Sequence, residues 1–180
     1  MNPEIISFAI NAHHNTNHLY DGNSYSVHLA MVAGYAQKYI QHIPEEARDT
    51  VLAACWLHDT IEDCRLSYND ILEVAGYDVA EIVYAVTNEK GRTRLARAST
   101  KYYEGIRNTP YASFVKLCDR AANIEYSKHK GSSMFEKYKT ENNHFMAQLF
   151  GTDPVKKETP LEFKDYEFPV YRDIYNLLDL

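Results

Sequence analysis

Hydrophobic residues recur along this chain at helical spacing, and no stretch alternates apolar and polar residues between turn signals, as paired strands would. The clearest case lies in the middle of the sequence. There, apolar positions follow the i, i+3, i+4, i+7, i+10 and i+11 pattern of one helix face: Tyr111, Phe114, Val115, Cys118, Ala121 and Ala122. The pattern predicts an all-α fold, a helical bundle with at most a minor β-hairpin.

Capping and turn signals divide this pattern into separate helices. Ser67 with Asp70 indicates an N-cap, Gly76 a C-terminal stop, and Asp78 the cap of the next helix. Pro residues at helix starts and apolar periodicity place the other expected helices: about 3–14, a helix carrying His28 and ending near 40, 44–59, a helix opened by Pro110, and about 133–150.

The end of the chain has a different character. Pro154, Pro160 and Pro169 interrupt any long helix there, although a last short helix is expected near 171–180. We therefore expect one domain over residues 1–150 and an appendage over residues 151–180 that packs on it.

The composition fits one globular domain. Of 180 residues, 45% are hydrophobic and 24% are charged, which suits a chain with one sizeable core and argues against wholesale disorder. No stretch approaches the ~18 consecutive apolar residues of a membrane span. The N-terminus has no basic region followed by an apolar run, so we expect a cytoplasmic protein. Three cysteines without a CxxC pair argue against a disulfide framework.

The net charge of −6 argues against a nucleic-acid polymer or a membrane surface as the main partner. An anionic substrate stays open, because a site needs only a local basic patch. Residues 90–107 provide one, with a single acidic residue, Glu104, among six basic ones: Lys90, Arg92, Arg94, Arg97, Lys101 and Arg107. Taken alone, this window is equally consistent with a solvated helix face.

Three predicted helices carry an ionisable side chain on or beside an apolar stripe: His28, His58 and Asp119. One such histidine is more often a satisfied core residue than a ligand. Three buried groups without partners would be costly, so their combination predicts that they meet. Together with Asp59 they would suit a divalent cation, because imidazole and carboxylate bind Mn, Fe, Ni or Zn.

The segment LHDTIEDC adds two further carboxylates. At i, i+4 spacing, Glu62 is expected beside His58 and Asp63 beside Asp59. A bound cation would lower the pKa of a water molecule. Glu62 or Asp63 would then orient that water or accept its proton. The alternative interpretation is a simple acidic helix end.

Four segments occur in the order of a known family: AHHNTNHLYDGNSYSVHL, WLHDTIEDC, VTNEK and KLCDRAANI. With their H…HD…D series they resemble the HD-domain phosphohydrolases. The match is closer still to the hydrolase domains of the RelA/SpoT family and its small single-domain animal relatives. The resemblance covers about residues 5–150. It implies removal of the 3′-pyrophosphate from guanosine alarmones such as ppGpp.

The resemblance also implies a role for individual residues. It implies that one divalent ion, normally manganese, is bound by four ligands: His28, His58, Asp59 and Asp119. It implies a catalytic acidic pair, Glu62 and Asp63. It implies four contacts to the phosphorylated nucleotide: Asn123, Lys90, Arg94 and Arg97.

One part of the first motif differs from the family. Where the family places Arg or Lys before the first metal histidine, this chain has His18 and Leu19. Three functions therefore stay open: an alarmone 3′-pyrophosphohydrolase, an HD hydrolase of another phosphorylated nucleotide or metabolite, and a catalytically silent HD-fold binding module. The complete ligand set and the acidic pair favour an enzyme. No P-loop, GxGxxG or GxSxG pattern is present.

Overall fold

The computed structural model describes residues 2–88, 99–151 and 162–180. Within these residues the chain is all-α apart from one two-stranded hairpin, which confirms the predicted fold class. The α-helices are α1 (Pro3–Asn15), α2 (Ser26–Lys38), α3 (Arg48–Leu57), α4 (Thr60–Asp63), α5 (Tyr68–Ala75), α6 (Tyr77–Val86), α8 (Thr100–Asn108), α9 (Ala112–Lys130), α10 (Ser133–Phe150) and α11 (Phe168–Leu178). Two short 3₁₀ helices, Ile40–His42 and Glu45–Ala47, precede α3.

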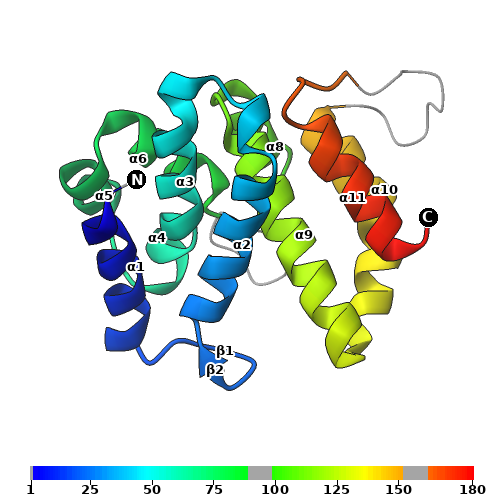
Figure 1. Ribbon diagram of the computed structural model, residues 1–180, viewed down its shortest axis with the longest axis horizontal. Helices are drawn as coiled ribbons and strands as arrows, with labels where there is room; N and C mark the ends of the chain where they lie inside the picture. Colours follow the sequence, from blue (N-terminus) through cyan, green and yellow to red (C-terminus); the bar gives the residue numbers. More distant parts are fainter. Residues whose placement is uncertain (1, 89–98, 152–161) are drawn as a thin grey trace.

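Helices α2, α3 and α9 form the centre of the molecule. Helix α2 packs on both α3 and α9, α6 packs on α3 and α9, and α10 and α11 cover the other side of α9 (Figure 1). Many fully buried positions on the central helices are alanines: Ala36, Ala54, Ala121 and Ala122. Because the distance between packed helices depends on the side chains at the contact, these small residues let the three backbones approach closely.

The hairpin joins α1 to α2. Its strands, β1 (Leu19–Tyr20) and β2 (Asn23–Ser24), pair antiparallel, with Tyr20 opposite Asn23. The two turn residues, Asp21 and Gly22, both have positive φ values of 50° and 79°. This conformation suits an Asp-Gly turn and confirms the turn signal in the sequence.

Two of the predicted helix ends are confirmed and one is wrong. Ser67 and Asp70 form a reciprocal capping box at the start of α5, and Gly76, whose φ is 85°, is the C-cap that follows its last residue, Ala75. Asp78 does not cap α6, because α6 begins one residue earlier, at Tyr77, directly after Gly76. Gly76 is therefore both the C-cap of α5 and the N-cap of α6.

The proline signals were less accurate than the periodicity. Pro44 is followed by a 3₁₀ turn before α3 begins at Arg48. Pro110 precedes Tyr111, whose φ of 64° keeps it outside the helix, so α9 begins at Ala112. Pro169 does not interrupt a helix but lies in the first turn of α11, where a missing N–H costs nothing.

The C-terminal helix packs on the centre of the molecule. Val170, Ile174 and Leu178 project from α11 at helical spacing, and all three are fully buried against the core that includes α9. Among the described residues, no helix combines the length and hydrophobicity needed to span a membrane.

We expect α11 to contribute to the stability of the whole domain. Ile174→Ala should lower the free energy of unfolding by about 2–5 kcal/mol, because the truncation leaves a cavity in a packed core. Asn176→Ala, on the exposed side of the same helix, should change it by less than about 0.5 kcal/mol. Denaturant unfolding measures both. An Ile174 variant as stable as the parent would mean that the tail is a separable appendage.

Candidate metal centre and adjoining cleft

The His58-Asp59 pair lies in a turn between two helices. Helix α3 ends at Leu57, and α4 begins at Thr60. The Thr60 hydroxyl donates to the Leu57 carbonyl at 2.6 Å and so replaces a main-chain helical bond at the end of α3. A two-residue turn, His58-Asp59, therefore separates α3 from α4.

Four predicted ligands come together around this turn. His28 comes from the first turn of α2, and Asp119 from α9. The ligand atoms of His28, His58 and Asp119 lie within 4.8 Å of one another. His28 Nε2 is 3.3 Å from both His58 Nε2 and Asp119 Oδ1. Asp59 Oδ2 is 2.9 Å from His58 Nε2 and 3.6 Å from His28 Nε2.

Neighbouring groups fix the orientation of these side chains. His58 Nδ1 is 2.9 Å from the Cys55 carbonyl, an obligate acceptor. Nδ1 therefore carries the proton, and a neutral His58 presents the Nε2 lone pair to the cluster. The Tyr25 hydroxyl donates to Asp59 Oδ2 at 2.5 Å. Lys116 Nζ donates at 3.0 Å to Asp119 Oδ2, the oxygen that does not face His28.

The electrostatics of the cluster favour positive charge at its centre. Burial alone would lower the pKa of His28, but hydrogen bonds to Asp119 and Asp59 outweigh it and raise the pKa to about 9. Burial would raise the pKa of Asp119, yet Lys116 and the two histidines hold it well below its usual range. Two nitrogen and two oxygen ligands that favour positive charge are a donor set suited to a divalent cation.

The two predicted catalytic carboxylates make different contacts. Asp63 Oδ2 is 3.7 Å from His18 Nδ1. Burial, followed by the charges of Asp59 and Glu62, raises the pKa of Asp63 to about 7. Glu62 is exposed and accepts hydrogen bonds from the backbone and side chain of Asn88, just after α6. Asp63 therefore faces the clustered residues, whereas Glu62 binds the residue that follows the end of α6.

A cleft of about 460 Å³, which we call the tyrosine cleft, adjoins the cluster. Its lining residues include Tyr20, Asp21, Asn123, Tyr126, Lys130 and Tyr138. Asn123 links the cleft to the cluster, because its Nδ2 donates to Asp119 Oδ1 at 2.6 Å and its Oδ1 accepts from the Tyr20 hydroxyl at 3.0 Å. Both polar groups of the Asn123 amide are thus engaged within the protein.

The predicted phosphate contacts Lys90, Arg94 and Arg97 lie outside the described residues. At the described end of the same basic window, Arg107 Nη1 donates to the Gln148 carbonyl near the end of α10. Arg107 therefore serves helix packing.

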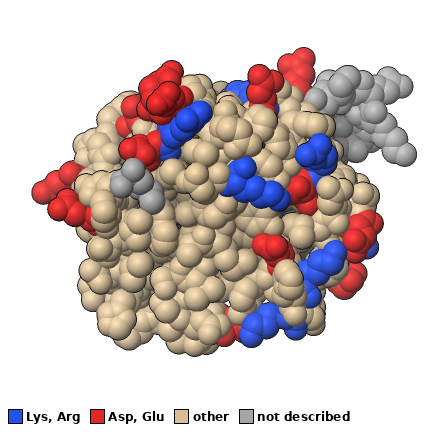
Figure 2. Space-filling view, viewed as in Figure 1, with Lys and Arg blue, Asp and Glu red and all other residues tan. Residues whose placement is uncertain are grey.

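The region of α1, the hairpin and α2 carries little charge. From residue 5 to residue 37, Asp21 is the only Asp, Glu, Lys or Arg. Figure 2 shows the corresponding surface largely without charged side chains. The first motif therefore brings no cation of its own to the cluster.

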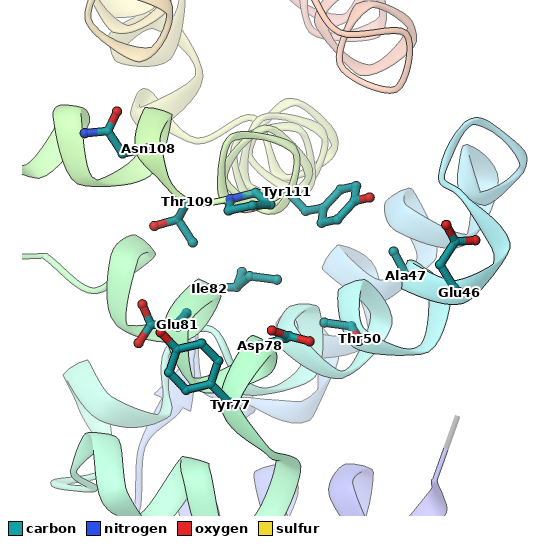
Figure 3. Close-up of a pocket in the computed structure, with 11 residues that line it drawn as sticks. Glu46, Ala47, Thr50, Tyr77, Asp78, Glu81, Ile82, Asn108, Thr109 and Tyr111 are labelled. Carbon is teal, nitrogen blue, oxygen red and sulfur yellow. The ribbon is translucent and has the colours of Figure 1, made fainter.

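A second pocket, of about 440 Å³, lies between α3, α6 and the turn from α8 to α9 (Figure 3). Its lining includes three carboxylates, Glu46, Asp78 and Glu81, and no Lys or Arg. None of the four clustered residues lines it. Its negative charge would repel a phosphorylated substrate, which favours the metal cluster and the tyrosine cleft over this pocket as the candidate functional site.

Sequence reasoning missed several residues of this site. Tyr25 packs against the rings of both His13 and His18, with ring centroids 4.2 Å from each, while its hydroxyl binds Asp59. Tyr25 and Lys116 each lie three residues before a predicted ligand, His28 and Asp119 respectively. Residues at this spacing share a helix face, so the spacing could have indicated that both lie near the cluster. For His13 and His18 the sequence offers no comparable signal.

A helical bundle with a His-His-Asp-Asp cluster from three separate segments is the arrangement of an HD domain. The profile of the family described as HD domain matches residues 6–151, and the chain therefore belongs to the HD domain family. The zebrafish (Danio rerio) guanosine-3′,5′-bis(diphosphate) 3′-pyrophosphohydrolase MESH1 is 30% identical to this chain over 122 residues. That alignment covers 67% of this chain and 66% of the relative.

Two further comparisons agree with this family. The Spiroplasma citri guanosine-3′,5′-bis(diphosphate) 3′-pyrophosphohydrolase is 28% identical over 138 residues, which cover 71% of this chain and 18% of the relative. The chain thus spans about two thirds of the zebrafish relative and much less of the bacterial one. A solved structure described as a metazoan ortholog of SpoT that hydrolyzes ppGpp has the same fold, with a TM-score of 0.67 and 21% identity. The aligned region covers 96% of this chain and 92% of that structure's chain. These matches confirm the resemblance predicted from the four sequence segments.

Protons and metal should compete for the cluster. A metal ligand needs a neutral imidazole, and the raised pKa keeps His28 protonated below about pH 9. The affinity for Mn²⁺ should therefore rise between about pH 6 and 9, by about tenfold per pH unit for each proton displaced. Calorimetric titration in buffers of different ionisation enthalpy measures affinity and proton release together. Affinity independent of pH, without proton release, would contradict this assignment.

Proposed function

We propose that this protein is a metal-dependent phosphohydrolase that removes the 3′-pyrophosphate from guanosine alarmones of the ppGpp type. One observation carries the proposal: His28, His58, Asp59 and Asp119 converge on one point beside a cleft of nucleotide size. The relatives named as guanosine-3′,5′-bis(diphosphate) 3′-pyrophosphohydrolases support the choice of substrate. We place the activity in the cytoplasm.

The four clustered side chains would hold one divalent ion, which we propose to be Mn²⁺. When bound, such an ion supplies Lewis-acid chemistry, polarising a phosphoryl oxygen and lowering the pKa of a water molecule. The chain's own contribution is to hold the ligands in place. Tyr25 and Lys116 each bind one carboxylate of the set, Asp59 and Asp119 respectively.

We propose Asp63 as the group that accepts the proton of the attacking water. It is half-buried beside the cluster, and burial together with the charges of Asp59 and Glu62 raises its pKa to about 7. A cation in the neighbouring cluster would lower this pKa and keep Asp63 ionised, as a general base requires. Glu62, which helps raise the pKa of Asp63 and holds Asn88, would act as its partner.

The tyrosine cleft would hold the nucleoside part of the substrate. Aromatic rings such as those of Tyr126 and Tyr138 offer flat faces to a base. Asn123 would meet the substrate at the boundary between the cleft and the cluster. Lys90, Arg94 and Arg97 remain our proposed contacts to the phosphates, where charge-assisted hydrogen bonds are strong.

One observation favours a second candidate, an HD hydrolase of another phosphorylated nucleotide or metabolite. The charged residues of the tyrosine cleft are Asp21 and Lys130, and they pair with each other at 3.5 Å. The cleft itself therefore offers little net positive charge to a nucleotide that carries a second diphosphate. A substrate with fewer phosphates would suit it better.

A substrate panel separates these candidates. With Mn²⁺ added, we expect release of pyrophosphate from ppGpp to exceed hydrolysis of nucleoside monophosphates, dinucleotides and sugar phosphates. Chromatography of the nucleotide products identifies the bond that is broken. Faster hydrolysis of another compound would favour the second candidate. Metal binding without hydrolysis of any compound would favour a silent binding module.

Variants of the acidic residues separate metal binding from turnover. Asp63→Asn and Glu62→Gln should retain Mn²⁺ but lose about 100-fold or more in kcat, the usual scale of general acid–base catalysis. Asp59→Asn should lose metal and activity together. The measurements are bound metal and hydrolysis rate for each variant. Glu73→Gln, an exposed carboxylate on α5, is the matched control and should behave as the parent does. Normal turnover by the Asp63 variant would refute its assignment as the base.

A further inference from the structure

Tyr20 lies at the boundary between the tyrosine cleft and the metal cluster. It belongs to β1, and its hydroxyl donates to Asn123 Oδ1 at 3.0 Å. Asn123 Nδ2 in turn donates to Asp119, at 2.6 Å to Oδ1 and at 3.0 Å to the main-chain carbonyl. Asp119 Oδ1 is the oxygen that faces His28. A chain of two hydrogen bonds therefore runs from the Tyr20 hydroxyl to a ligand atom of the cluster.

The ring of Tyr20 makes a separate contact with another ligand. It stacks on the His28 imidazole, with centroids 4.8 Å apart and planes 24° from parallel. This contact matters because His28 Nδ1 is buried and has no hydrogen-bond partner among the described residues. His58 has the usual hydrogen bond at Nδ1, which fixes its ring. For His28, ring stacking takes the place of that bond.

We propose that Tyr20 is a positioning residue that holds both His28 and Asp119 in the geometry needed to bind the metal ion. The hydroxyl acts on Asp119 through Asn123, and the ring acts on His28 directly. The hairpin gives Tyr20 a fixed place, because Tyr20 pairs with Asn23 in the antiparallel ladder of β1 and β2. The inference rests on the proposed function, since it assumes that the cluster binds a metal ion.

The test measures metal affinity, without any substrate. Tyr20→Phe removes the hydroxyl and keeps the ring, so we expect Mn²⁺ to bind about tenfold more weakly, at the lower end of the range for residues behind metal ligands. Tyr20→Ala also removes the stacking and should weaken binding further. The visible absorption of the Co²⁺-loaded protein should change in both variants, because the ligand geometry changes. Thermal unfolding of the metal-free protein checks that each variant folds.

Tyr126→Phe is the matched control. It removes the same hydroxyl from a ring that contacts Tyr20 in the same cleft, with centroids 4.6 Å apart, but the hydroxyl binds Asp21 and not the cluster. Its Mn²⁺ affinity should stay within about twofold of the parent value. An equal loss in both variants would show a general effect of the cleft and would overturn the proposal.

A double-mutant cycle tests the route through Asn123. If the hydroxyl acts only through this amide, Tyr20→Phe should cost nothing further in a protein that already carries Asn123→Ala. Full additivity of the two losses would overturn the route. If Tyr20→Phe binds Mn²⁺ as the parent does, the inference fails while the proposed function stands. If the parent binds no better than Asp119→Asn, both fail.

Discussion

The convergence of four ionisable side chains at one point, two of them buried, is the constraint on which this structure depends. His28 and His58 are almost completely buried, and Asp59 and Asp119 lie against them. Unpaired charges at such depth are expensive, so the groups must be satisfied by one another, by protons or by a cation. The raised pKa of His28 shows which charge the two carboxylates favour at that position. The same electrostatic demand would hold a divalent ion.

The packing of the central helices brings the four side chains together. The ligands come from α2, from the turn after α3 and from α9, and these helices contact one another directly. Alanines at buried contact positions, such as Ala36 and Ala121, let the backbones come close enough for short side chains to meet. In the turn after α3, Asp59 Oδ2 lies 2.9 Å from His58 Nε2.

Two tyrosines, Tyr20 and Tyr25, contact the cluster from residues 5–37, a segment that carries almost no charge. Tyr25 binds Asp59 directly, and Tyr20 reaches Asp119 through Asn123. Hydroxyl and ring contacts can orient the ligands without adding a charge that would compete with the ion. The hairpin that carries Tyr20 also borders the cleft, so the residues that would meet a substrate and those that hold the ligands are partly the same.

The sequence determined the helices, the HD motif and the candidate ligands, whereas the tertiary structure decided how each ligand is held. Helical periodicity reports neighbours at i+3 and i+4, so it predicted the face of α9 that carries Cys118. A glycine stop signal predicted the C-cap of α5 at Gly76. Periodicity did not report the break between α3 and α4 at Thr60, nor the hydrogen bond between Glu62 and Asn88. The contact between Tyr20 and Asn123 joins residues 103 positions apart. Such a contact depends on how the hairpin and α9 pack, and no local pattern records that packing.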